Sequence, residues 1–167
     1  IGVVARETHE VGIEDVAAVE LHARRELLPR QAEAIADKHI GEQRAAHAPV
    51  SATRPVAAIP ATLLPCQPIG PDDGWCDAPG DPNYNRPVKL PYAASHERLW
   101  RDDDVYDLVL VLGHNDDPVV PGMGSAIFLH LTRPERTPTE GCVALAEADL
   151  RDVVKLLGGR SVIEIRT

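Results

Sequence analysis

One cysteine and one histidine in the C-terminal third of the chain could together carry out acyl-transfer chemistry. Cys142 follows Gly141, and His130 lies twelve residues earlier in the sequence. A thiol becomes a strong nucleophile when a neighbouring base takes its proton, and imidazole is a common base. Glycine allows a tight turn that directs backbone N–H groups toward a developing oxyanion. These residue types suggest that Cys142 is a nucleophile, that His130 is its general base and that Gly141 is part of an oxyanion turn.

The same residues also have simpler interpretations. A cysteine before Val-Ala-Leu is more often a small buried side chain, and a histidine on a strand is more often a satisfied core residue. The three cysteines, Cys66, Cys76 and Cys142, include no CxxC pair. An odd count leaves at least one thiol unpaired, which disfavours a disulfide framework and a structural zinc site. Cys76 is expected to pack in the interior, or to pair with Cys66 in an oxidising compartment.

Regular elements around these residues would hold them in place. The alternation in Ser125–Thr132 predicts a strand with Ala126, Phe128 and His130 on one face. The loop Arg133–Gly141, stiffened by two prolines, can bring the chain back toward that strand. Val105–Leu112 predicts a buried strand and Ser161–Ile165 a final strand. Helical spacing over Glu147–Leu157, closed by a Gly-Gly pair, predicts a helix after the cysteine.

The N-terminal half has a different composition. Ile13–Ala46 is rich in Ala, Glu, Arg and Leu, and its spacing predicts two short helices broken near Pro29. From Pro49 to Pro91, ten of forty-three residues are proline, so this zone is expected to be mostly loop with short or edge strands. Together the elements predict a β-rich α+β fold.

Overall composition limits the function classes. The 167 residues suit one domain, and a net charge of −9 argues against a nucleic-acid partner. No apolar run reaches the length of a transmembrane helix, and no signal peptide is visible. Asp102–Asp104 lacks the spacing of a calcium loop. No metal or organic cofactor is expected, and a monomer is assumed.

Several separated motifs occur in an order that resembles the YkuD-type L,D-transpeptidase catalytic domain, in a short bacterial subgroup. The strongest is the block from Gly124 to Leu145, in which the family places its histidine and its nucleophilic cysteine. These positions correspond to His130 and Cys142. The other motifs that carry the resemblance are Asp73–Asp77, Tyr84–Pro87, Leu90–Tyr92, Glu97–Trp100, Tyr106–Asp107 and Asn115–Val119.

This resemblance implies a mixed-sheet or sandwich fold and a cysteine-dependent L,D-transpeptidase. Such an enzyme acts on peptidoglycan stem peptides through an acyl-enzyme, in the periplasm or cell wall, and reacts with carbapenems. The acceptor, an amine or water, stays open. The usual Ser-His-Gly-Cys motif reads Thr139–Cys142 here, and Ala144 stands where the family has arginine. No role of that second histidine or that arginine is therefore carried over.

The resemblance divides the chain into residues 1–69, an atypical region, and residues 70–167, the catalytic domain. The first region lacks the family's early strands and its glycine-threonine-proline motif. It is a replaced segment, a divergent one, or the product of another reading frame, and the sequence leaves these alternatives open.

Four further residues are candidates for substrate binding. His114 and Asn115 follow a predicted buried strand, at a position where loops often carry binding groups. Arg133 lies in the loop between the proposed base and nucleophile, where it could meet a substrate carboxylate. Thr139 belongs to the cysteine motif. Solvated loop positions are the simpler account of these side chains.

Two other functions compete with the transpeptidase hypothesis. One is a non-catalytic or degenerate peptidoglycan-binding domain, whose cleft is incomplete. The other is a metal-dependent hydrolase in which His114, His130 and Cys142 are three ligands of a catalytic zinc ion.

Overall fold

The computed structural model describes residues 18–22, 34–36, 43–44, 50–52, 60–158 and 161–166. The first four strands are β1 (Ala18–His22), β2 (Ala34–Ala36), β3 (Gln43–Arg44) and β4 (Val50–Ala52). The middle of the chain forms β5 (Cys66–Pro68), β6 (Asp73–Cys76), β7 (Pro87–Lys89) and β8 (His96–Arg98). The last elements are β9 (Val109–Val111), β10 (Phe128–Leu131), β11 (Val143–Leu145), α1 (Glu147–Leu156) and β12 (Val162–Arg166).

These strands form three sheets. A six-stranded sheet has the order β2-β11-β10-β9-β4-β5, and two three-stranded sheets have the orders β7-β6-β8 and β1-β12-β3. Pairing is mostly antiparallel, but β10 pairs with β11 and β4 pairs with β5 in parallel. The described part of the chain is therefore β-rich with mixed sheets, compatible with the predicted fold class.

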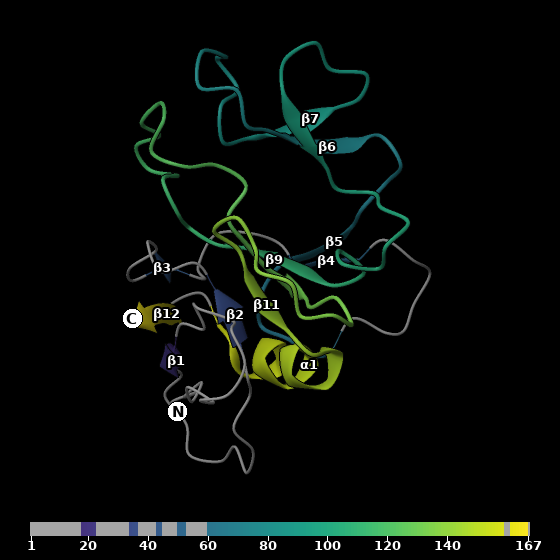
Figure 1. The fold of residues 1–167 in the computed structure, drawn as a ribbon, viewed down its shortest axis with the longest axis vertical. Helices are drawn as coiled ribbons and strands as arrows, with labels where there is room; N and C mark the ends of the chain where they lie inside the picture. Colours follow the sequence, from purple (N-terminus) through teal and green to yellow (C-terminus); the bar gives the residue numbers. More distant parts are fainter. Residues whose placement is uncertain are drawn as a thin grey trace.

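One face of the six-stranded sheet is covered by α1. Leu150, Val153 and Val154 are spaced so that they project from one side of this helix, and all three are buried. They pack with Leu129, Val143 and Leu145 of the sheet. Figure 1 shows α1 on one side of the sheet and β6 and β7 on the other. Acidic Glu147 and Asp149 in the first turn suit the positive end of the helix dipole.

The opposite face of the sheet carries the proposed chemistry. Phe128 and Cys142 belong to a second buried cluster, and Trp75 of β6 packs on it. The rings of Trp75 and Phe128 meet edge to face with centroids 5.5 Å apart. This contact joins the β7-β6-β8 sheet to the six-stranded sheet, which we call the central sheet. The predicted alternation holds over β10, since Leu129 joins the α1 side and Phe128 the other.

Several predicted elements have different limits. Of the strand predicted at Val105–Leu112, only β9 forms. The earlier residues are held in a turn, in which the N–H of Asp107 donates to the carbonyl of Asp104. The strand predicted at Ser125–Thr132 begins only at Phe128, because Ala126 adopts a left-handed backbone with φ 57°. The final strand lies at Val162–Arg166, one residue later than predicted at each end.

The helices predicted within Ile13–Ala46 were wrong where the structure describes this segment. Residues 18–22, 34–36 and 43–44 are strands β1, β2 and β3. β1 and β3 flank β12, and β2 pairs with β11. Helix propensity is only a weak preference, and here the pairing of these residues with strands near the C-terminus overrides it. The rest of the predicted helical segment lies outside the described residues.

No helix among the described residues has the length and apolarity needed to cross a bilayer. The boundary at residues 69 and 70 stays a prediction. β4, although upstream of that boundary, pairs with β9 in the central sheet.

Candidate active site

The parallel pair β10–β11 brings the proposed nucleophile and base to one face of the sheet. Leu129 lies opposite Val143 and His130 opposite Ala144. Cys142 immediately precedes β11, so it lies beside Phe128, two positions along the strand from His130. Two residues of a strand span about 6–7 Å, so the backbones of Cys142 and His130 are offset by about that distance on this face.

The thiol of Cys142 is held by backbone groups. Its Sγ donates to the carbonyl of Ala126 at 3.3 Å and accepts from the N–H of Phe128 at 3.4 Å. Only 8% of the residue is exposed. Burial raises the pKa of Cys142 to about 12, although the Phe128 hydrogen bond acts in the opposite direction. Cys142 is therefore a neutral thiol near pH 7 in this conformation.

His130 has one ring nitrogen engaged. Its Nδ1 lies 2.8 Å from the carbonyl of Leu131. Because a carbonyl only accepts, Nδ1 carries the proton in this contact, and Nε2 is then the basic nitrogen. Burial lowers the pKa of His130, and the nearby Arg133 and Arg101 lower it further. The imidazole is therefore neutral near pH 7, as a general base must be.

The structure shows no hydrogen bond between Cys142 and His130. Both bonds to the cysteine sulfur come from the backbone. The two residues share a face without forming a catalytic pair in this conformation. A catalytic contact would require the sulfur to leave the Ala126 carbonyl.

Tyr106 fixes the imidazole from the side. Its ring meets the His130 ring edge to face, with centroids 5.4 Å apart. The Tyr106 hydroxyl donates to Glu97 at 3.1 Å, and Arg101 binds the same carboxylate oxygen at 3.1 Å. Burial raises the pKa of Tyr106, so the hydroxyl stays protonated. Sequence reasoning placed Tyr106 in a buried strand, and no spacing signal pointed to this contact.

The positive φ of Gly141 agrees with the predicted turn. Its φ of 96° is a conformation that other residues rarely adopt. Thr139 closes the same turn, because its hydroxyl donates to the carbonyl of Cys142. Thr139 is thus next to the proposed nucleophile, with its hydroxyl engaged by the backbone.

The other predicted substrate-binding residues are engaged in loop structure. His114 Nε2 contacts the Met123 carbonyl at 2.8 Å, beside Gly124, where a Cβ would lie only 2.6 Å from that nitrogen. The Asn115 amide donates to the carbonyls of Val120 and Gly124. Arg133 reaches Asp103 at 3.4 Å, with 44% of its side chain exposed. Their substrate-binding roles stay predictions.

Asn85 connects three parts of this region, and sequence reasoning missed it. Its Oδ1 accepts from Trp75 Nε1 at 3.0 Å and from the N–H of Ala126 at 3.3 Å. Its Nδ2 donates to the carbonyls of His114 and Asn115 at 2.9 and 2.8 Å. Only 3% of Asn85 is exposed. The amide thereby fixes Ala126, whose carbonyl accepts from the Cys142 thiol.

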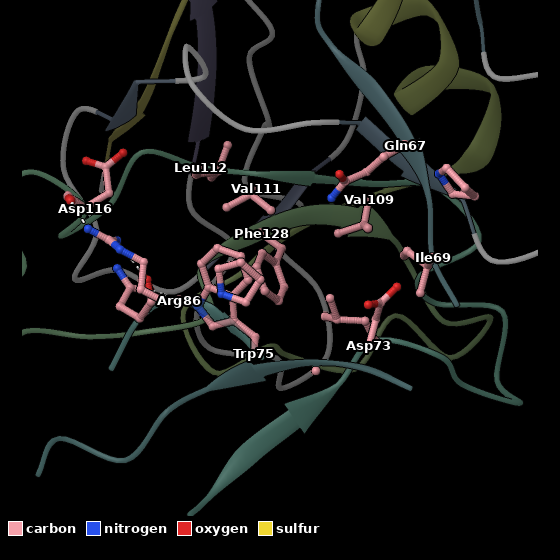
Figure 2. A pocket seen from close by; sticks show the side chains of 15 residues that line it. Gln67, Ile69, Asp73, Trp75, Arg86, Val109, Val111, Leu112, Asp116 and Phe128 are labelled. Atoms are coloured by element: carbon pink, nitrogen blue, oxygen red, sulfur yellow. Dashed lines mark hydrogen bonds between the residues drawn. The ribbon is translucent and has the colours of Figure 1, made fainter. Parts of the chain in front are cut away.

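A cavity of about 260 Å³ lies between the central sheet and the β7-β6-β8 sheet. Trp75 and Phe128 stand at its centre, Arg86 and Asp116 at one end, and Asp73 at the other (Figure 2). Cys142 and His130 do not line it. Phe128 links the cavity to the thiol, because it lines the cavity and its N–H donates to Sγ.

The arrangement does not support the metal-dependent alternative. Within residues 60–158 and the other described segments, no three His, Cys, Asp or Glu side chains gather as a metal site. His114, His130 and Cys142 all belong to that range. The three cysteines are free thiols, Cys66 exposed and the other two buried, so the Cys66–Cys76 disulfide considered from the sequence is not formed.

Replacing Asn85 with alanine should destabilise the protein by about 2–4 kcal/mol, because buried carbonyls and N–H groups lose their partners. Urea unfolding followed by fluorescence would measure the change. Asn83→Ala is the matched control, since the Asn83 amide makes an exposed contact with Tyr92. Equal, small effects for both variants would contradict the role assigned to Asn85.

The native thiol of Cys142 should react slowly with iodoacetamide at pH 8. With a pKa of about 12, its thiolate fraction is on the order of 10³-fold below that of an ordinary cysteine. Exposed Cys66 is the internal control, and protein unfolded in urea should be alkylated at all three thiols. Peptide mass spectrometry over time would follow each site. Native Cys142 reacting as fast as Cys66 would contradict the buried, neutral thiol described above.

One comparison with known proteins agrees with the resemblance noted in the sequence, and two find no match. No curated protein and no solved structure matches the chain. A family model described as the YkuD L,D-transpeptidase catalytic domain matches residues 50–165. This match covers more than half of the 167 residues and includes both β10 and β11. The chain therefore belongs to the YkuD family of L,D-transpeptidase catalytic domains.

Proposed function

We propose that this protein is a cysteine-dependent L,D-transpeptidase that remodels or cross-links peptidoglycan stem peptides in the periplasm or cell wall. Family membership supplies the reaction class and the peptidoglycan substrate. The observation that carries the assignment of residues is the shared face of β10 and β11, with Cys142 beside Phe128 and His130 beside Ala144.

The first half of the reaction forms an acyl-enzyme. Cys142 Sγ leaves the Ala126 carbonyl and attacks a peptide carbonyl carbon, while its proton passes to Nε2 of His130. Backbone N–H groups of the turn at Gly141 and Cys142 stabilise the oxyanion. The C–N bond then breaks, His130 returns the proton to the departing amine, and a thioester remains on Cys142.

The second half restores the thiol. An acceptor amine or water attacks the thioester carbonyl, and His130 takes its proton. The C–S bond then breaks, and the proton moves to the sulfur. The held tautomer of His130 supports this cycle, because the Leu131 carbonyl keeps the proton on Nδ1 and leaves Nε2 to exchange protons.

A non-catalytic peptidoglycan-binding domain is the second candidate. The buried, protonated thiol with its two backbone hydrogen bonds favours it. Such a domain would bind stem peptides without acylating its thiol, so one experiment separates the two functions.

Incubation with a tetrapeptide stem should add the mass of the tripeptide acyl group to the intact protein. Cys142→Ala should abolish the adduct because the thiol assigned as the nucleophile is gone. Cys66→Ser should keep it, since Cys66 lies on the exposed strand β5. Stem binding without any adduct in the wild type would favour the second candidate, and an adduct that persists in Cys142→Ala would sink the nucleophile assignment.

Replacing His130 with alanine should lower the acylation rate by about 10²–10⁴-fold, as loss of a general base does. In the wild type, the rate should fall at low pH as His130 gains a proton. Since burial lowers the pKa of His130, that fall should be centred below pH 6.5. Stopped-flow or quenched acylation assays over pH 4.5–8 would show it. If the fall in rate at low pH were unchanged in His130→Ala, the titrating group would be another residue.

A further inference from the structure

The cavity between the two sheets has opposite charges at one end and apolar walls elsewhere. Arg86 and Asp116 line that end (Figure 2). Trp75, Leu99, Val109, Val111 and Phe128 form much of the remaining wall. Its volume of about 260 Å³ lies just below the roughly 300–1,000 Å³ of drug-sized sites, so it suits a small ligand.

Arg86 is oriented without being neutralised. One guanidinium nitrogen donates to the Asn85 carbonyl at 2.9 Å and the other terminal nitrogen to the Asp116 carbonyl at 2.7 Å. A guanidinium has five N–H donors, and these contacts use two. Within the described part of the chain, no carboxylate lies in ion-pair range of Arg86. The remaining donors can therefore meet an external carboxylate.

The carboxylate of Asp116 has no protein partner among the described residues either. Only its backbone carbonyl is engaged, by Arg86. The acid at the other end of the cavity differs, because Asp73 binds Lys89 at 2.6 Å and the N–H of Gly70. One end of the cavity thus offers an available cation and an available anion side by side, while the other end is already paired.

We propose that this cavity binds the α-amino acid head group of a ligand whose apolar side chain lies against Trp75 and Phe128. Arg86 receives the carboxylate and Asp116 the ammonium group. A ligand with both charges meets both side chains, whereas an acid or an amine alone leaves one of them paired only with solvent, because Arg86 is exposed and Asp116 half-buried at this open end. The site is separate from the Cys142 thiol and goes beyond the proposed acyl transfer.

The two tryptophans provide a direct readout. The sequence has only Trp75 and Trp100; Trp75 lines the cavity, and Trp100 does not. In ¹⁵N-labelled protein, phenylalanine should shift the indole N–H signal of Trp75 and leave that of Trp100 in place. Trp100→Phe would assign the two signals. A ligand of this size should bind with a Kd of about 1–10 mM.

Single-charge analogues test the head-group assignment. Both 3-phenylpropionate and 2-phenylethylamine keep the ring and lose one charge, so each should bind about tenfold more weakly than phenylalanine. Equal shifts with all three compounds would reduce the site to a non-selective apolar cavity, and no shift with any of them would exclude it. Either result would overturn the proposal.

Variants identify the partner of each charge. Arg86→Gln should lower phenylalanine affinity about tenfold and remove the advantage over 2-phenylethylamine. Asp116→Asn should remove the advantage over 3-phenylpropionate. Lys155→Gln and Asp117→Asn are charge-matched controls, because neither residue lines the cavity and Lys155 pairs with Asp152 on α1, and they should bind normally. Arg86→Lys keeps the charge if Arg86→Gln fails to fold, and it should retain part of the preference. Unchanged selectivity in both Arg86→Lys and Asp116→Asn would contradict the assignment.

The same titration in Cys142→Ser separates this site from the catalytic hypothesis. Phenylalanine should bind the variant with unchanged affinity, since Cys142 does not line the cavity. Loss of binding in this variant would contradict a separate site. Normal binding in a protein that forms no acyl-enzyme would leave the cavity assignment intact and count only against the proposed function.

Discussion

The parallel pairing of β10 with β11 is the constraint on which the rest of the site depends. It places Cys142 beside Phe128 and His130 beside Ala144, while Leu129 and Val143 turn toward α1. A shift of one residue in this register would exchange the two faces and bury His130 under the helix. The apolar contacts with α1 and the edge-to-face contact between Trp75 and Phe128 stabilise this register. They therefore help to keep Cys142 and His130 on the same face of the sheet.

The surroundings of Cys142 create a tension between packing and reactivity. Burial stabilises the neutral thiol and raises the pKa of Cys142 to about 12, yet a nucleophile must give up that proton. The Ala126 carbonyl accepts from the thiol and would repel a thiolate, whereas the Phe128 N–H would stabilise one. Asn85 holds Ala126 in place by accepting a hydrogen bond from the Ala126 N–H. The same side chain also connects β6 with the loop at His114 and Asn115. The resting state thus protects the thiol, and the proposed reaction requires its release from Ala126.

Local patterns predicted part of this arrangement. Period-two alternation correctly placed Phe128 and Leu129 on opposite faces of the sheet. The helix predicted from Glu147 begins at that residue. The early part of the strand predicted at Ser125 failed, because side chains from distant segments hold that backbone: Asn85 binds Ala126, and Ser125 binds the Cys76 carbonyl. The N-terminal strands were missed for a similar reason, since their partners are strands β11 and β12 far along the chain. Such long-range contacts, including those of Asn85 and Tyr106, leave no periodic signal.

In the proposed reaction, one of the three thiols, Cys142, carries the acyl group. After brief reaction with a stem peptide and an acid quench, tandem mass spectrometry of proteolytic fragments would locate the acyl mass among Cys66, Cys76 and Cys142. We expect acylation at Cys142 alone, with the modification disappearing as cross-linked or hydrolysed product accumulates. Product formation with an unmodified Cys142, or an acyl group located on Cys66 or Cys76, would contradict it.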